Sequence, residues 1–312
     1  MQVFRKLEDV PKHYGRTVVS VGNFDGVHRA HVEVLKSIVH RAKEQRAKAV
    51  VVCFEPHPTR VLGPDRQINL ITPTAEKLRL LELAGVNAVL LLPFTRDLSL
   101  MPPREFVSQI LRKGLHACEV HEGYNFRFGY KAEGDASMLA SFGRDMDFDV
   151  KVHPEMMLRG QIVSSTQVRQ LLGEGQVSRA RYLLGRAFSI NAHAAPGRGY
   201  GAKYTVPTIN LSEYHELSPR DGVYVTRTRV GEKECFDSVT NVGNRPTFGE
   251  DSFAIESHLL DFHPVELLPH TEVEIYFLNR LRDEIKFPSV EGLREQIGRD
   301  VRRAQRYFKL IK

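Results

Sequence analysis

The hydrophobic pattern of this chain changes its period near residue 185, and this change limits the folds that its 312 residues can adopt. Before that point, runs typical of buried strands alternate with helix-period segments. The run "TVVSVGNF" is typical of a buried strand, and Val32, Leu35 and Val39 then mark one face of a helix over 30–46. Strands that alternate with helices favour a parallel sheet with sites at the carboxyl ends of its strands. We therefore predict an α/β first domain with a doubly wound parallel sheet.

Beyond residue 185 the strands are no longer separated by strong helix patterns. Four strand-like segments follow one another, at 222–230, 234–243, 253–262 and 271–281. A final helix is expected to begin near Ser289, a plausible N-cap, with Leu293, Ile297 and Val301 on one face. This pattern predicts a small antiparallel β-barrel or sandwich with a terminal helix. We place the domains at 1–184 and 185–312, with the join inside 174–197.

Composition restricts the class of protein and its partners. The content of 42% hydrophobic and 26% charged residues is that of a soluble globular protein. The net charge of +6 is spread along the chain, which suits anionic small molecules such as nucleotides and is weak support for nucleic acid. Three distant cysteines indicate neither a disulfide framework nor a zinc site. The chain shows no leader and no apolar run of membrane-spanning length, so we expect a cytoplasmic protein without membrane partners.

The stretch "VGNFDGVHRAHVEVL" combines a glycine-bounded turn with two histidines at the start of a helix. Gly22 and Gly26 allow the backbone to approach a ligand, and the helix start offers free N–H groups and a positive dipole. His28 and His31, three residues apart, are expected to lie on one face and to donate hydrogen bonds to phosphate oxygens. A metal site would need a third ligand that the local sequence does not supply. Two histidines that only cap the helix remain the alternative.

A second stretch, "IVSSTQVRQLL", opens another helix with hydroxyl side chains. Ser164, Ser165 and Thr166 can cap that helix or contact phosphate, and Arg169 lies one turn further on. A guanidinium at that position can bind a phosphate with two hydrogen bonds. A capped helix with an exposed arginine is the alternative.

Seven short motifs in order resemble one enzyme family. "GNFDGVHRAH" is similar to the His-x-x-His signature of the nucleotidyltransferase superfamily, in the longer form of bacterial FAD synthetases. "FEPHP", "EGYNFRFGYKAEGD" and "SSTQVR" match further segments of these enzymes, while "VPTINL", "NVGNRPTFG" and "ESHLLDF" resemble riboflavin kinase. The seven motifs run from residue 22 to residue 262. The chain thus resembles the bifunctional riboflavin kinase/FMN adenylyltransferases, which implies a nucleotidyltransferase-like, Rossmann-type first domain and a barrel second domain.

The resemblance implies that the first domain joins FMN and ATP to give FAD and pyrophosphate. The residues expected around the ATP phosphates lie on the first loop and helix: Gly22, Asn23, Phe24, Asp25, His28 and His31. The resemblance places three more on the opposite side: Ser164, Thr166 and Arg169. Asn125 and Arg127 would lie on the FMN side, although an aromatic core segment is the alternative for "YNFRFGY".

The resemblance implies that the second domain phosphorylates riboflavin with ATP and Mg²⁺. Thr208 and Asn210 would bind metal and phosphate, and Glu256 would be the general base. A strand glutamate that only faces solvent is the alternative for Glu256. Arg245 is expected to shape a loop over the flavin or nucleotide.

Several positions depart from the family pattern. Ala30 and Ala192 stand where glycine is usual, and Asn125 stands where aspartate is common. Thr205 and Val206 replace glycine and phenylalanine in the loop before "PTIN". These changes leave open an FMN adenylyltransferase whose degenerate kinase domain only binds flavin.

Two further alternatives belong to other classes. One is a nucleotidyltransferase that acts on a different phosphorylated acceptor. The other is a flavin sensor or a basic nucleic-acid-binding protein, which the retained histidine pair, Arg169 and Glu256 argue against. We therefore expect ATP, riboflavin, FMN and FAD as partners, and no nucleic acid.

Overall fold

The structure, a computed structural model, describes residues 1–63, 68–195, 208–232, 234–244, 253–262 and 271–311. It divides into two compact units, Met1–Ser165 and Thr166–Lys312. Each unit has the fold class that the sequence predicts for it.

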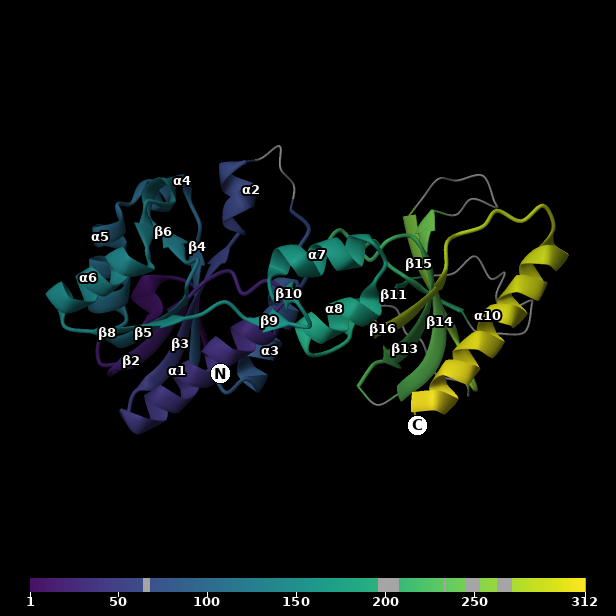
Figure 1. Cartoon of the computed structure of the whole chain (residues 1–312), viewed down its shortest axis with the longest axis horizontal. Helices are drawn as coiled ribbons and strands as arrows, with labels where there is room; N and C mark the ends of the chain where they lie inside the picture. Colours follow the sequence, from purple (N-terminus) through teal and green to yellow (C-terminus); the bar gives the residue numbers. More distant parts are fainter. Residues whose placement is uncertain (64–67, 196–207, 233, 245–252, 263–270, 312) are drawn as a thin grey trace. The chain divides into compact units, whose positions relative to one another are not determined.

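A six-stranded sheet forms the centre of the first unit (Figure 1). Its strands, in spatial order, are β1 (Gln2–Phe4), β4 (Ala88–Pro93), β3 (Lys48–Glu55), β2 (Thr17–Val21), β5 (Ala117–Gly123) and β8 (Asp149–His153). All neighbouring strands in this sheet are parallel. The predicted doubly wound parallel sheet is therefore confirmed.

Helices bury both faces of this sheet, as the continuous apolar character of its strands requires. On one face α1 (Arg29–Glu44) and α3 (Thr74–Leu83) supply Leu35, Ile38 and Leu81 to a core with β2, β3 and β4. The other face is covered by α5 (Pro103–Phe106), the π-helical segment Val107–Gly114 and α6 (Ala136–Met146). The chain from Pro103 to Gly114 is thus helical in two segments of different type.

The remaining elements of the first unit are short. They are the 3₁₀ helices Leu7–Asp9 and Tyr130–Ala132, α2 (Pro58–Leu62), α4 (Arg96–Leu100), and the hairpins β6–β7 (Arg127–Phe128, Gly134–Asp135) and β9–β10 (Met157–Leu158, Gln161–Ile162).

The order of the strands places a topological switch between β2 and β5. From β2 the chain continues through β3 to β4 on one side, and then returns to place β5 on the other side of β2. The ladder between β2 and β5 ends at Val19 and Val120, and the buried carboxyl of Glu122 accepts the next free N–H, that of Val21, at 2.6 Å. Burial raises the pKa of Glu122 well above its ordinary value. This carboxyl lies beside the last residue of β2, at the switch point, which is the part of such sheets where ligands bind.

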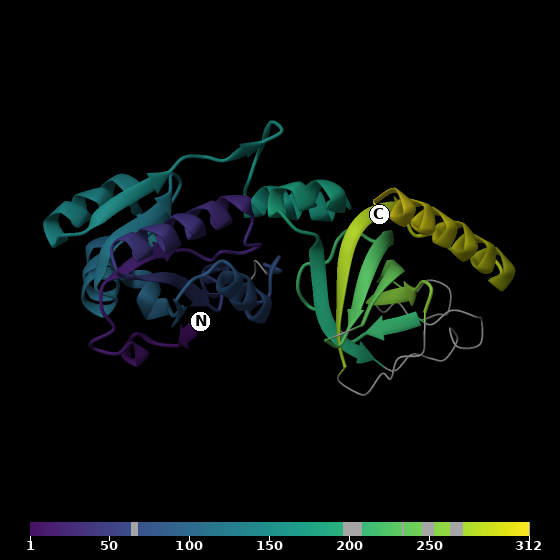
Figure 2. The ribbon, with the colours of Figure 1, turned by 90° about the horizontal axis from the view of Figure 1, so that it is seen from below.

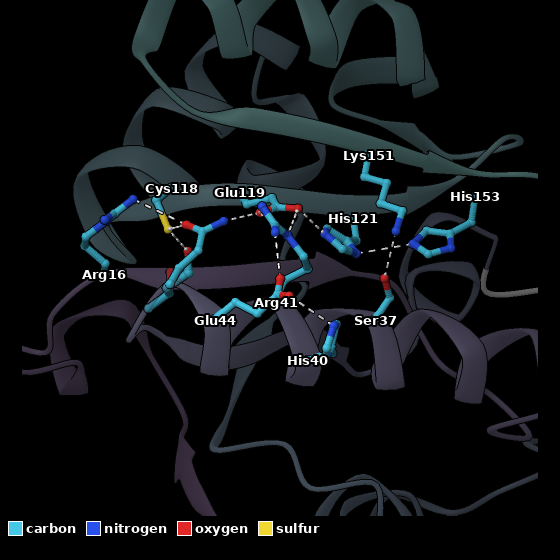
Figure 3. A network of polar contacts seen from close by, with 12 residues as sticks. Arg16, Ser37, His40, Arg41, Glu44, Cys118, Glu119, His121, Lys151 and His153 are labelled. Atoms are coloured by element: carbon cyan, nitrogen blue, oxygen red, sulfur yellow. Dashed lines mark hydrogen bonds and ion pairs between the residues drawn. The ribbon is translucent and has the colours of Figure 1, made fainter.

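A polar network fills part of the space between β5, β8 and α1 (Figure 3). The guanidinium of Arg41 binds the buried carboxylate of Glu119, with Nε 3.0 Å from each oxygen. Nε2 of the fully buried His121 lies 2.7 Å from the same carboxylate, and its Nδ1 lies 3.3 Å from Nε2 of His153. Burial lowers the pKa of both histidines, while Arg41 and His121 hold the pKa of Glu119 below its ordinary value against the effect of burial.

These shifts predict a stability that decreases as the pH falls. Because both histidines have folded-state pKa values below the ordinary 6.5, the unfolded chain binds more protons below about that pH. The free energy of unfolding should then fall as the pH drops from 7 to 5, by at most about 1.4 kcal/mol per pH unit for each histidine. Urea unfolding followed by circular dichroism at pH 5, 6, 7 and 8 measures this slope.

The control separates the buried pair from histidines in general. The double variant His121→Gln, His153→Gln removes the titration of this pair and should reduce the slope, while His258, whose pKa burial also lowers, keeps its own contribution. His40→Gln changes an exposed histidine of α1 and should leave the slope as it is. An unchanged slope in the double variant would contradict this account.

The second unit contains a closed antiparallel barrel (Figure 1). Its strands, in spatial order, are β11 (Phe188–Ala195), β12 (Thr208–Leu211), β15 (Phe253–Leu259), β14 (Glu234–Asn244), β13 (Gly222–Val230) and β16 (Glu272–Arg282). Two helices precede it, α7 (Ser165–Gly173) and α8 (Val177–Leu184), and α10 (Val290–Ile311) follows it. The barrel alternative is confirmed, and so is Ser289 as the cap of the last helix, since its Oγ accepts the N–H of Gly292 at 3.2 Å.

Hydroxyl groups occupy the interior of the barrel. The five fully buried members of this cluster are Thr226, Thr228, Ser238, Thr240 and Ser257. Thr228 on β13 and Ser257 on β15 are 2.7 Å apart although β14 lies between their strands, so their contact crosses the interior. Figure 2 shows α10 along the outside of the barrel, where Ala304 and Phe308 pack against Val225 and Val239.

The domain boundary at 184/185 stays a prediction. The helices α7 and α8 belong to the second compact unit, and α8 packs against β11 and β16.

Candidate functional sites in both units

The loop after β2 owes its shape to residues in the left-handed region of backbone space. Phe24, Gly26 and Val27 have φ angles of 48°, 86° and 37°. Only glycine adopts such angles without strain, so Phe24 and Val27 are held there by their surroundings, where both are buried. The tight turn lets the chain enter α1 directly from the carboxyl end of the central strand.

The two histidines of the signature meet at the start of α1. Their rings stack with centroids 3.6 Å apart at an interplanar angle of 16°. His28 is the N-cap of α1, and its Nδ1 accepts the N–H of His31 at 3.3 Å. The i, i+3 spacing thus brings both imidazoles to one face, and His28 caps the helix as well.

Asp25 ties the loop to the rest of the unit. Its buried carboxylate accepts the N–H groups of Ile71 and Thr72 at 3.2 and 3.0 Å, and its carbonyl accepts the hydroxyl of Ser165 at 2.8 Å. Asp25 thus connects the loop after β2 with two segments that are distant in the sequence, one at Ile71 and Thr72 and the other at Ser165. Its expected place at the ATP phosphates stays a prediction.

The other predicted residues of the first half are distributed over three segments. Ser164 precedes α7, while Thr166 and Arg169 lie on α7 in the second unit. Asn125 and Arg127 are exposed just beyond the carboxyl end of β5, and Nη1 of Arg127 lies 3.4 Å from the carboxylate of Asp135. The roles of all five stay predictions.

Lys77 is a buried cation below the loop that the sequence analysis missed. Its side chain is only 3% exposed, and Nζ donates to the carbonyl oxygen of Asn23 at 3.2 Å. Burial raises the pKa of the Cys53 thiol to about 11, and the charge of Lys77 opposes this, so the ammonium lies near the carboxyl end of β3. The available signal was a lysine four residues before Leu81, on the apolar face of α3.

We expect Lys77→Met to affect stability and nucleotide affinity in opposite directions. An apolar residue of similar volume removes the cost of a buried charge, so the free energy of unfolding should stay the same or rise. The loop loses positive charge beneath it, so KM for ATP in FAD formation should rise about tenfold. Thermal unfolding and initial rates test both effects. Arg79→Met, an exposed change on the same helix, is the control, and a lower stability with unchanged KM would contradict the role given to Lys77.

The strand register of the barrel brings the kinase candidates together. Thr208 pairs with His258 and Asn210 with Glu256, so all four side chains lie on one face of β12 and β15. Oγ1 of Thr208 is 3.2 Å from Nδ1 of His258, and burial lowers the pKa of His258 to about 4. Arg245 lies outside the described residues, as do Thr205 and Val206, whereas Ala192 lies on β11.

Glu284 is a second carboxylate near Glu256 that the sequence analysis missed. Nδ2 of Asn241, the partner of Glu256 on β14, donates to Oε1 of Glu284 at 3.0 Å. Gly243 has a φ of 150°, and a side chain there would collide with the Glu284 carboxylate. Burial raises the pKa of Glu284, the charges of Asp221 and Glu256 raise it further, and the Asn241 hydrogen bond opposes them.

Comparison with known proteins finds two family models that match different parts of the chain. A family model described as FAD synthetase matches residues 10–167, and one described as riboflavin kinase matches residues 184–308. A bifunctional riboflavin kinase/FMN adenylyltransferase from Haemophilus influenzae is 31% identical over 309 residues, which cover 99% of each chain. The chain belongs to this family. Both catalytic domains of the bifunctional riboflavin kinases/FMN adenylyltransferases are present, and both activities are ATP-dependent transferases.

Further likenesses extend over nearly the whole length. The bifunctional riboflavin kinase/FMN adenylyltransferase of Escherichia coli strain K12 is 33% identical over 296 residues, covering 95% of this chain and 94% of its own. A crystal structure described as a macrolide-efflux protein from Streptococcus pneumoniae matches with a TM-score of 0.86 and 27% identity, covering 97% of this chain and 98% of that one. Within the described residues, no helix has the length and apolar character to cross a membrane.

Proposed function

We propose that this chain phosphorylates riboflavin on the outer face of its barrel and adenylylates FMN beside the loop between Gly22 and His28. The observation that carries the second assignment is the stacked pair of His28 and His31 at the start of α1, beyond the central strand of the switch. A helix start and two imidazoles suit the phosphates of ATP.

In the adenylyl transfer, a phosphate oxygen of FMN attacks the α-phosphorus of ATP, and pyrophosphate leaves. The protein catalyses this reaction mainly by aligning the phosphates and by stabilising their charge. His28 and His31 would donate hydrogen bonds to the phosphates as negative charge develops on the leaving pyrophosphate. Lys77 adds positive charge from below the loop, and its ammonium reaches the loop through the Asn23 carbonyl.

Five further residues keep their predicted roles in this proposal. Ser164, Thr166 and Arg169 would bind ATP phosphate from the second stretch. Asn125 and Arg127 would bind FMN, since an exposed guanidinium beyond the end of β5 can pair with its phosphate.

In the kinase, a ribityl hydroxyl of riboflavin attacks the γ-phosphorus of ATP. Glu256 would accept the hydroxyl proton, and Arg245 would shape a loop over the ligands. The donor set on this face is a hydroxyl, an amide and a carboxylate, which are the hard oxygen ligands that Mg²⁺ prefers. Thr208 and Asn210 would therefore hold Mg²⁺, which neutralises charge on the ATP phosphates when bound.

The experiment that tests the function is a chromatographic product assay with purified protein, riboflavin, ATP and Mg²⁺. FMN followed by FAD is the expected result. FAD formed from supplied FMN, with no product from riboflavin, would reduce the function to adenylyl transfer. No product from either flavin would overturn both assignments.

The remaining expectations concern the partners and the location of the enzyme. ATP, riboflavin, FMN and FAD are the partners that the two domains imply. The absence of nucleic-acid binding and the cytoplasmic location stay predictions.

A further inference from the structure

His258 lies between the proposed kinase site and the core under α10. Its neighbour Ser257 points into the barrel, where it joins the hydroxyl cluster, so the alternation of a strand places Glu256 and His258 on the outer face. Leu260, two residues further on, packs in the same outer cluster as Phe308 of α10. The imidazole is therefore enclosed on one side by apolar packing and adjoins the ligand face on the other.

The contact of His258 with Thr208 restricts the hydroxyl on which the proposed site depends. A threonine hydroxyl carries one hydrogen and two lone pairs, and its hydrogen rotates freely unless a partner holds it. Nδ1 of His258 lies 3.2 Å from Oγ1 of Thr208 on the neighbouring strand. When the imidazole is protonated at Nε2, Nδ1 accepts the hydroxyl hydrogen, and both oxygen lone pairs stay available to a cation.

Nε2, the other ring nitrogen of His258, makes no hydrogen bond to the described residues, and it is buried. A histidine kept for packing alone would be costly, because an unpaired polar atom is buried with it. Its one polar contact in the described chain is the one to Thr208.

We propose that His258 is a positioning residue of the kinase: it accepts the hydroxyl hydrogen of Thr208 and so leaves the oxygen free for the divalent cation that accompanies ATP. This inference rests on the proposed assignment of Thr208 and deepens it. His258 itself contacts neither substrate nor metal in this account.

Three variants at residue 258 and one at Thr208 test the proposal through the kinetics of the full-length enzyme. His258→Phe keeps the ring volume and removes the contact, so KM for the Mg²⁺–ATP complex in FMN formation should rise about tenfold with a smaller change in kcat. His258→Asn places a polar atom near the position of Nδ1, and it should restore KM to within about threefold of the parent value. His258→Gln places its polar atom near Nε2 instead, and it should not restore KM.

The double variant decides whether His258 acts through Thr208. Thr208→Val should raise KM by itself, and adding His258→Phe should have no further effect. Thermal unfolding followed by circular dichroism, measured on the same samples, reports whether the barrel of each variant is folded, and FAD formation from supplied FMN reports whether the first unit is intact. Independent, additive effects of the two changes would overturn the proposal, whereas a Thr208→Val variant with unchanged KM would overturn the site assignment beneath it.

A measurement without nucleotide or metal complements the kinetics. Long-range proton–nitrogen NMR spectra report which nitrogen of each imidazole carries the proton, and the His258→Asn variant assigns the signal of His258. We expect an unprotonated Nδ1 whose resonance shifts in Thr208→Val. A signal from the Nδ1–H tautomer, or one that Thr208→Val leaves in place, would overturn the proposal even if a variant proved too unstable for kinetics.

Discussion

The His28→Ala variant is expected to lose FAD formation from FMN by about 10²- to 10³-fold, the effect of removing one donor from a site that stabilises developing charge. FMN formation from riboflavin should not change, because that reaction belongs to the other unit. His28 stacks on His31 at the start of α1, so the loss removes both a donor and the support of its neighbour. Separate initial-rate assays with FMN and with riboflavin measure the two effects.

The cap that His28 provides complicates a simple interpretation of this variant. Nδ1 of His28 accepts the N–H of His31, and the loss of a helix cap costs about 1 kcal/mol. His28→Asn keeps an acceptor near that position and removes the other ring nitrogen, so it should be as inactive as alanine but more stable. If both reactions fell equally in a folded His28 variant, the two-site account would be wrong.

The Glu256→Gln variant should show the opposite selectivity. Removing a general base typically costs about 10²- to 10⁴-fold, so FMN formation should fall by this amount while FAD formation from supplied FMN persists. The glutamine keeps the size of the side chain and its place opposite Asn210 and Asn241. The measurement is kcat for FMN formation at saturating riboflavin and ATP.

A matched control distinguishes this role from a general effect of charge on the barrel. Glu272→Gln removes an exposed carboxylate at the start of β16, opposite His193, and both rates should stay at the parent level. A Glu256→Gln variant with parental kinase activity would instead support the alternative that this glutamate only faces solvent.

Local sequence patterns were sufficient to predict the strand β2 and the helix α1, and to predict how the histidine motif lies on that helix. The apolar run before Gly22 and the helical period after Ala30 predicted β2 and α1, because a buried strand and a one-sided helix each impose a period on the chain. The spacing of His28 and His31 predicted a shared face, and the stacked rings confirm that geometry.

Local patterns could not predict the roles of residues whose contacts lie far away in the sequence. Lys77 shares the apolar face of α3 with Leu81, but its contact with the loop is known only once the position of α3 beside the loop is known. Glu122 resembles a strand residue until the switch at β2 leaves the N–H of Val21 without a ladder partner. Each of these roles depends on which elements become neighbours, and no short stretch of sequence contains that information.

The sequence by itself determined the two fold classes, the glycine-bounded turn before α1 and the order of the family motifs, since all of these depend on residues close together along the chain. Only the tertiary structure decided that the Asp25 carboxylate clamps Ile71 and Thr72, and that Thr208 meets His258 fifty residues later. The physical reason is that strand order and register arise from the burial of whole faces. A side chain's partner is therefore set by the packing of the complete domain, and its own neighbours in the sequence do not specify it.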